Sequence, residues 1–110
     1  MEEVMEIIEI LEEAQLKGAS DIHLAPGTQV MFRIDGKLVR MSDDIVPPYA
    51  IENMLEPMIS KEQQAELERA GELDFAYSIP GFQRLRVNVF RQRGTYAMAI
   101  RILSFEIPDP

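Results

Sequence analysis

The stretch RLRVNVFRQRGTYAMAIRIL, residues 84–103, has the pattern of an antiparallel β-hairpin. Apolar residues alternate on both sides of Gly94, and a glycine between two such runs is typical of a hairpin turn. The apolar sets should share the core face, because side chains alternate along a strand: Leu85, Val87, Val89, Tyr96, Met98 and Ile100. The opposite face then receives Arg84, Arg86, Asn88, Ala97, Ala99 and Arg101. We therefore expect arginines of two strands to converge on one face, with small alanines beside them.

This hairpin also concentrates the positive charge. It holds five of the eleven basic residues and no acidic residue, although the chain has a net charge of −8. Residues 1–83 carry −11 and residues 84–110 carry +3. Nucleic acid would be repelled by the acidic remainder, so we expect no nucleic-acid partner. Guanidinium groups offer planar, bidentate donors that suit the phosphate or carboxylate of a small anion. The residues alone leave a second interpretation open, in which these arginines pair with nearby glutamates on a solvated face.

Length and composition predict one domain. A chain of 110 residues, 46% hydrophobic and 27% charged, falls in the range of globular proteins and can bury a single core. The acidic N-terminus, MEEVMEIIEILEEAQLKG, lacks the basic flank of an export signal, and no apolar run approaches a membrane span. Zero cysteine excludes thiol catalysis and disulfides and fits a reducing compartment. We therefore expect a cytoplasmic location.

The first half of the chain predicts one helix and a hairpin. Apolar residues recur at helical spacing in residues 2–17, and Gly18 can end that helix. We expect its buried face to contain Val4, Ile7, Ile8, Leu11 and Ala14. Residues 21–24 and 30–41 have strand patterns, and Asp35-Gly36 is a strong hairpin signal.

The second half predicts two short helices and three strands. Pro47 and Pro48 can open a helix that runs to Met54. Ser60 and Gln63 have the spacing of a capping box ahead of a helix over residues 61–70, which Gly71 would close. Strands follow at 73–78, 84–91 and 95–103, with a Pro80-Gly81 turn after the first. The order of elements predicts an α+β domain.

Other candidate sites have ordinary structural explanations. His23 is the only histidine and stands between two apolar strand residues, so we expect a structural role and no metal site. The aspartates at positions 21, 35, 43, 44 and 74 fall at predicted turns or strand edges, where we expect them to be solvated. Gly36-Lys37 is not a phosphate loop, because the residue five positions earlier is methionine and leucine follows the lysine. We expect no catalytic residues and no ATPase activity in this chain alone.

Four segments in order carry a resemblance to a known family: GASDIHL (18–24), RIDGKL (33–38), ELDFAYSIPG (72–81) and RVNVFRQRG (86–94). Together they resemble the N-terminal domain of the type IV pilus retraction ATPases, the PilT family, over nearly the whole chain. The resemblance implies a PAS-like fold, with helices packed on one face of an antiparallel sheet. In this superfamily of hexameric secretion and pilus ATPases, that domain precedes a RecA-like domain with Walker motifs. We find no such second domain within residues 1–110.

The resemblance also implies a role for two arginines. Arg86 and Arg101 match the arginines with which such domains reach the phosphates of ATP held by the RecA-like domain, and Arg84 and Arg91 are possible auxiliary contacts. ATP and magnesium would then be bound in the parent protein, with no cofactor on this domain alone. The implied partners are the RecA-like domains of the same and neighbouring subunits, in a homohexamer, and the pilus machinery at the inner face of the bacterial membrane.

The implied function is ATP-driven pilus retraction and twitching motility. We favour retraction over extension because residues 71–94 resemble the retraction branch and no extra N-terminal domain precedes this one. Two alternatives stay open: a stand-alone PAS-like sensor that binds a small nucleotide such as a cyclic dinucleotide, or a structural ring-assembly module whose arginines pair with a neighbouring subunit's carboxylates.

Overall fold

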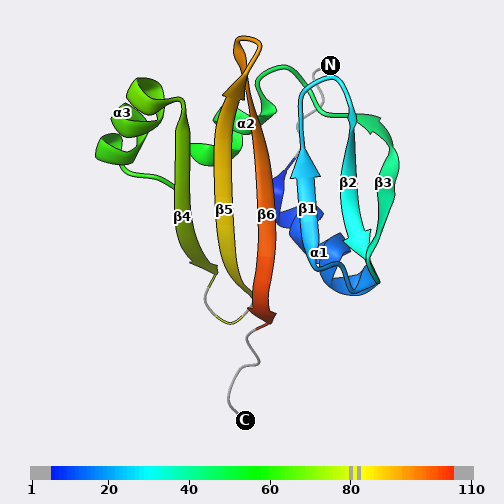
Figure 1. Ribbon diagram of the computed structural model, residues 1–110. Coiled ribbons are helices and arrows are strands. Elements are labelled where there is room, and N and C mark those ends of the chain that lie inside the picture. Colours follow the sequence, from blue (N-terminus) through cyan, green and yellow to red (C-terminus); the bar gives the residue numbers. More distant parts are fainter. Residues whose placement is uncertain (1–5, 80, 82, 106–110) are drawn as a thin grey trace.

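A six-stranded antiparallel sheet forms the centre of the computed structural model, which describes residues 6–79, 81 and 83–105 (Figure 1). The sheet order is β3-β2-β1-β6-β5-β4. Helices α1 and α2 lie against one face of the sheet, and α3 packs beside the edge strand β4 (Figure 1). This confirms the predicted α+β fold. The elements are α1 (Ile7–Lys17), β1 (Asp21–Leu24), β2 (Gln29–Ile34), β3 (Lys37–Ile45), α2 (Ala50–Leu55), α3 (Lys61–Ala70), β4 (Glu72–Ile79), β5 (Gln83–Gln92) and β6 (Thr95–Phe105).

The sheet consists of two three-stranded meanders that meet where β1 pairs with β6. Strands β1, β2 and β3 are consecutive neighbours, and so are β4, β5 and β6. At the junction Ile22 lies opposite Ile100, and Asp21 lies opposite Arg101. Residues from the two ends of the chain therefore become neighbours in the middle of the sheet.

The β2–β3 and β5–β6 hairpins each turn through two residues with positive φ. Asp35 and Gly36 have φ of 51° and 80°, and Arg93 and Gly94 have φ of 53° and 81°. Such a pair matches the right-handed twist of the flanking strands. The hairpin predicted at Asp35-Gly36 and the turn predicted near Gly94 are both confirmed.

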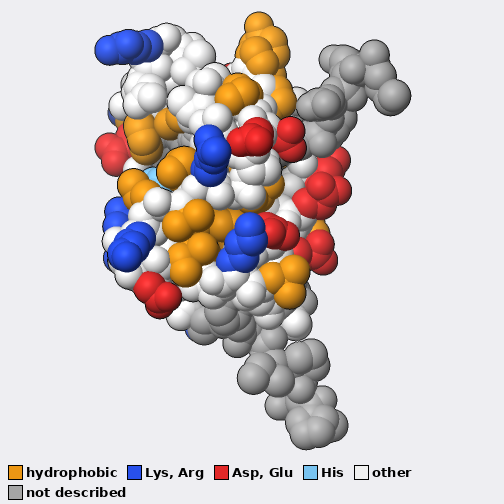
Figure 2. All heavy atoms as spheres, turned by 90° about the vertical axis from the view of Figure 1, so that its right-hand side faces the viewer, with side chains coloured by type: hydrophobic (Ala, Val, Ile, Leu, Met, Phe, Trp, Pro, Cys, Tyr) orange, Lys and Arg blue, Asp and Glu red, His pale blue; other side chains and the backbone are white. Residues whose placement is uncertain are grey.

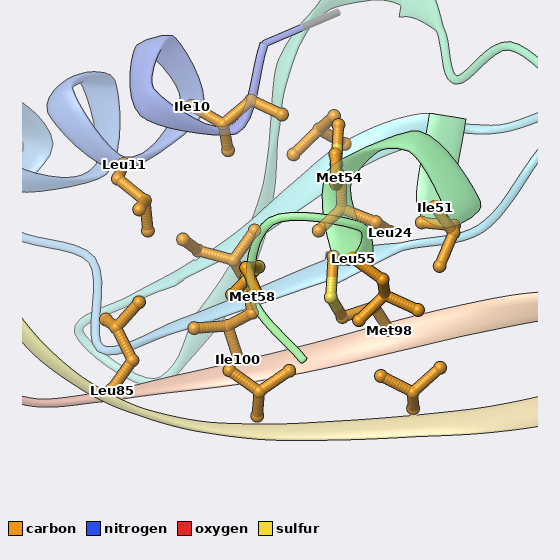
Figure 3. Close-up of a cluster of buried hydrophobic side chains, with 14 of the residues drawn as sticks. Ile10, Leu11, Leu24, Ile51, Met54, Leu55, Met58, Leu85, Met98 and Ile100 are labelled. Carbon is orange, nitrogen blue, oxygen red and sulfur yellow. The ribbon is translucent and has the colours of Figure 1, made fainter. Parts of the chain in front are cut away.

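The core fills the space between the sheet and the helices, and it uses the predicted faces of β5 and β6. Leu85, Val87 and Val89 are fully buried, as are Met98 and Ile100. Figure 3 shows side chains from α1, α2 and the sheet meeting in one cluster, among them those of Ile10, Leu11, Ile51, Met54, Leu55, Leu85, Met98 and Ile100. The opposite faces of β5 and β6 carry Arg84, Arg86, Asn88 and Arg101, together with Phe90, Ala99 and the buried Ala97.

Helix α1 differs from its prediction at the N-terminal end. Glu6 has extended backbone angles, so the helix begins at Ile7; residues 2–5 of the predicted helix, Val4 among them, lie outside the described residues. Ile8 was expected in the core but is 44% exposed, and Ile10 is buried in its place. The buried face repeats at intervals of three and four residues from Ile7, which Ile8 does not match.

The other predicted boundaries are close to the observed ones. Helix α3 begins and ends as predicted: Ser60 Oγ accepts from the Gln63 amide at 3.1 Å, and Gln63 Oε1 accepts from the Ser60 amide at 2.8 Å. Helix α2 begins at Ala50 instead of Pro47, and β3 continues to Ile45. Pro80 of the predicted turn lies outside the described residues.

Candidate functional site

Arg86 and Arg101 are direct cross-strand neighbours on β5 and β6. Their side chains are 64% and 70% exposed, on the face of the sheet opposite the buried residues of the same strands. The next pair on this face, Asn88 and Ala99, is only half-buried. The predicted convergence of these two arginines on one face is therefore confirmed.

Arg86 forms a bidentate ion pair with Asp74 of β4. Its Nε lies 3.1 Å from Asp74 Oδ1, and its Nη2 lies 3.2 Å from Oδ2. The hydrogen bonds from Asp74 and its negative charge raise the pKa of Arg86 further above its already high usual value. The ion pair with Asp74 therefore favours the charged form of the Arg86 guanidinium.

Arg101 forms an ion pair with Asp21 of β1, across the junction of the two meanders. Its Nε donates to Asp21 Oδ1 at 3.0 Å, and the hydroxyl of Ser20 donates to Oδ2 at 2.8 Å. The Asp21 side chain is only 14% exposed. Burial alone would raise the pKa of Asp21, but the hydrogen bonds from Ser20 and Arg101, with the charges of Arg101 and Arg33, outweigh burial and lower it.

The expectation that the aspartates are solvated is wrong for Asp21, which is mostly buried, whereas Asp74 is exposed but also forms an ion pair. Each lies on a strand next to an arginine-bearing strand, and each neutralises one arginine. Asp35 does occupy a turn, with positive φ, and Asp43 and Asp44 are exposed on β3. The partners of the two arginines are therefore aspartates and not the expected glutamates, because sheet topology decides which strands become neighbours.

Arg84 and Arg91 lie in different surroundings. Arg84 is exposed and follows the same alternation of β5 as Arg86. Arg91 points the other way: its Nη2 donates to the Glu68 carbonyl of α3 at 2.9 Å and to Tyr96 Oη at 3.2 Å. Its guanidinium also lies 5.6 Å from the centre of the Tyr96 ring. Arg91 thus joins α3 to the β5–β6 hairpin and does not share the site of Arg86 and Arg101.

The chain is similar in sequence and in structure to proteins of known function. No family model matches it. Over 95 residues, 86% of the chain, it is 34% identical to the type IV pilus retraction ATPase PilT of Pseudomonas aeruginosa. It also matches the crystal structure of the pilus retraction motor PilT with bound ADP, with a TM-score of 0.85 and 38% identity over 96% of the chain. The chain is homologous to the N-terminal region of PilT.

The homology covers only part of each relative. The chain spans 28% of the Pseudomonas PilT and 31% of the PilT in the crystal structure. The Legionella pneumophila ATPase DotB has the same fold at a TM-score of 0.74, with 19% identity over 89% of the chain and 28% of DotB. The pilus ATPase PilT and the ATPase DotB thus share one architecture in this region.

Two further surface features lie away from the two arginines, whereas His23 lies on the same face of the sheet, opposite Ala99 in the strand pair next to Asp21–Arg101. Figure 2 shows the side of the molecule that carries β3, where hydrophobic, basic and acidic side chains are mixed; Leu38, Val39 and Ile45 are exposed on this edge strand. A cavity of about 470 Å³ lies between α2 and α3, with Leu55, Leu67 and several glutamates in its wall. His23 is exposed on β1.

The described residues contain neither a cluster of metal ligands nor a membrane-spanning helix. Within residues 6–79, 81 and 83–105, no group of three His, Cys, Asp or Glu side chains could hold a metal ion. In the same part of the chain, no helix is long and apolar enough to cross a membrane.

The arginine pair retains hydrogen-bonding capacity for a ligand. Arg101 uses only Nε with Asp21, and Arg86 uses Nε and Nη2 with Asp74. Among the described residues, the terminal nitrogens of Arg101 and Nη1 of Arg86 have no hydrogen-bond partner. These donors, on two adjacent strands of an exposed face, suit an anion with several oxygens.

The lowered pKa of Asp21 predicts a specific acid sensitivity. Because the folded state favours the ionised carboxylate, Asp21 stabilises the fold above the pKa of an unfolded aspartate, about 3.9, and this stabilisation is lost as pH falls through the lower folded value. We expect Asp21→Asn to be less stable than wild type at pH 6, with the difference shrinking below about pH 4. Urea midpoints from pH 6 to pH 2.5 measure this, with Asp44→Asn as the matched control. Parallel curves for wild type and Asp21→Asn would contradict it.

Proposed function

We propose that this chain is the N-terminal domain of a ring-forming ATPase that drives pilus retraction, and that Arg86 and Arg101 contact the phosphates of ATP bound to a RecA-like domain of that ATPase. One observation carries the proposal: in a domain homologous to the N-terminal region of PilT, two arginines are direct cross-strand neighbours on an exposed face. Closure of this face over the nucleotide would bring both guanidiniums to the phosphates.

The chemistry of the two arginines supports this role. During phosphoryl transfer, negative charge spreads over the phosphate oxygens, and a pre-positioned guanidinium stabilises it, with contributions that reach about 10³- to 10⁵-fold in rate. ATP and magnesium would be held by the RecA-like domain, and Arg84 would lie at the margin of the contact. We assign no phosphate contact to Arg91, because α3 and Tyr96 already engage it.

The proposed partners follow from this arrangement. They are the RecA-like domains of the same and neighbouring subunits in a homohexamer, and the pilus machinery at the cytoplasmic face of the inner membrane. Movement of this domain against its RecA-like partner would couple hydrolysis to withdrawal of pilin subunits. The direct test is turnover of the intact ATPase with alanine at Arg86 or Arg101.

The ion pairs of both arginines favour a second candidate, a structural module in which these side chains only stabilise surfaces. Ion pairs of a largely exposed arginine contribute little to stability, because solvent screens them. The two candidates differ in one respect: a phosphate contact needs the planar guanidinium, whereas a surface ion pair needs only a positive charge.

The affinity of the chain itself for nucleotides distinguishes the ATPase domain and the structural module from a nucleotide sensor. Two exposed guanidiniums without a base pocket provide about 3 kcal/mol of contact, which the entropy cost of association largely cancels. We expect calorimetry to give a dissociation constant for ATP of about 1 mM or weaker, and the same for cyclic dinucleotides. A saturable micromolar isotherm that disappears in Arg86→Ala would instead support a sensor.

A further inference from the structure

The two arginines lie between two carboxylates in a charge sequence that runs across four strands. From β4 to β1 the order is Asp74, Arg86, Arg101, Asp21. The like charges are central, and directly opposed like charges destabilise a strand pair. Asp74 on β4 and Asp21 on β1 each neutralise the positive charge of the arginine on the neighbouring strand. The charges of these four side chains therefore sum to zero, although the two arginines come from the most basic stretch of the sequence.

We propose that Asp74 and Asp21 determine the ligand specificity of this site: they hold the arginines in the absence of ligand and are displaced only by linked phosphates, as in a nucleoside diphosphate or triphosphate. A single phosphate or a halide interacts with one guanidinium only slightly more strongly than the carboxylate that it must replace. A polyphosphate reaches both arginines with one molecule, so the second contact forms at a high effective concentration. This inference rests on the proposed phosphate contact of Arg86 and Arg101.

The structure lets both carboxylates release their arginines without being left buried and unpaired, which would be costly. Asp74 is 45% exposed, so water can solvate it once Arg86 leaves. Asp21 is mostly buried, but it keeps the hydroxyl of Ser20 at 2.8 Å, and the positive charge of Arg33 acts on it as well.

The two aspartates should differ in how strongly they compete with phosphate for their arginines. Asp74 occupies two donor nitrogens of Arg86, whereas Asp21 occupies only Nε of Arg101. A phosphate can make its first contact with the terminal nitrogens of Arg101 before Asp21 is displaced from Nε. It must displace Asp74 to gain the full bidentate edge of Arg86. Asp74 should therefore suppress phosphate binding more than Asp21.

Tripolyphosphate and orthophosphate are suitable probes for the 110-residue chain. At constant ionic strength, each anion is titrated into wild type, Asp74→Asn, Asp21→Asn and the double variant, and the Nε–H signals of Arg86 and Arg101 are followed by NMR. Asp44→Asn is the matched control, since it removes the same charge from an exposed position on β3. Arg86→Ala tests the arginine contact itself.

We expect each of the two site substitutions to strengthen tripolyphosphate binding about two- to fivefold, with the larger gain in Asp74→Asn, and to reduce the preference for tripolyphosphate over orthophosphate. Asp44→Asn should change affinity by less than about 1.5-fold at physiological salt. Unchanged or weaker binding in both site variants, or no response of either arginine signal even in the double variant, would overturn the specificity role. Equal binding by wild type and Arg86→Ala would instead remove the arginine contact on which the proposed function rests.

Discussion

Alanine in place of Arg86, in the intact ATPase, is expected to lower kcat by about 10²- to 10³-fold, because one pre-positioned donor to the transferring phosphate is lost. Arg101→Ala should have an effect of similar size, since the two residues are direct neighbours on the same face. Both side chains are largely exposed, so their removal should leave the fold intact and the ring assembled. Steady-state phosphate release, with size-exclusion chromatography as the check on assembly, measures the outcome.

Lysine substitutions and a matched control decide between the two candidate functions. Lysine keeps the charge but lacks the planar, bidentate edge, so a phosphate contact predicts a large loss in Arg86→Lys, whereas a surface ion pair predicts almost none. Arg40→Ala on β3 removes the same charge from another exposed ion pair, with Asp43 at 3.5 Å, and should be nearly silent. Near-wild-type turnover in both Arg86→Ala and Arg101→Ala would show that the arginines form only a solvated face.

Leu85→Ala is expected to lower the free energy of unfolding by about 3 kcal/mol. Leu85 is 0% exposed on β5 and belongs to the cluster between the sheet and the helices (Figure 3). Its truncation removes apolar contacts and leaves a cavity that rigid neighbouring strands cannot fill. For a domain of this size we expect the melting temperature to fall by about 15 °C, as measured by thermal unfolding followed by circular dichroism.

Leu16→Ala is the matched control, because the same chemical change occurs at a position that is 83% exposed on α1. It should change stability by less than about 0.5 kcal/mol. Equal losses from both substitutions would mean that the core does not include β5 as described.

The local elements of this fold could be predicted because short-range signals specify them. The capping box of Ser60 and Gln63, the two-residue turn at Asp35-Gly36 and the alternation around Leu85 each involve residues a few positions apart. Hydrogen bonds and steric limits within such segments do not depend on tertiary contacts. Tertiary contacts decided what local signals did not specify, such as the buried face of α1, where Ile10 is buried and Ile8 is not.

By itself the sequence determined that Arg86 and Arg101 share a face, since alternation in a hairpin leaves no other choice, and its motifs pointed to the pilus ATPases. Only the tertiary structure decided what those arginines touch. Asp21 is 80 residues from Arg101 along the chain, and the two meet because β1 pairs with β6 at the centre of the sheet. Which strands become neighbours depends on the packing of the whole core, and no local pattern around Asp21 or Asp74 encodes it.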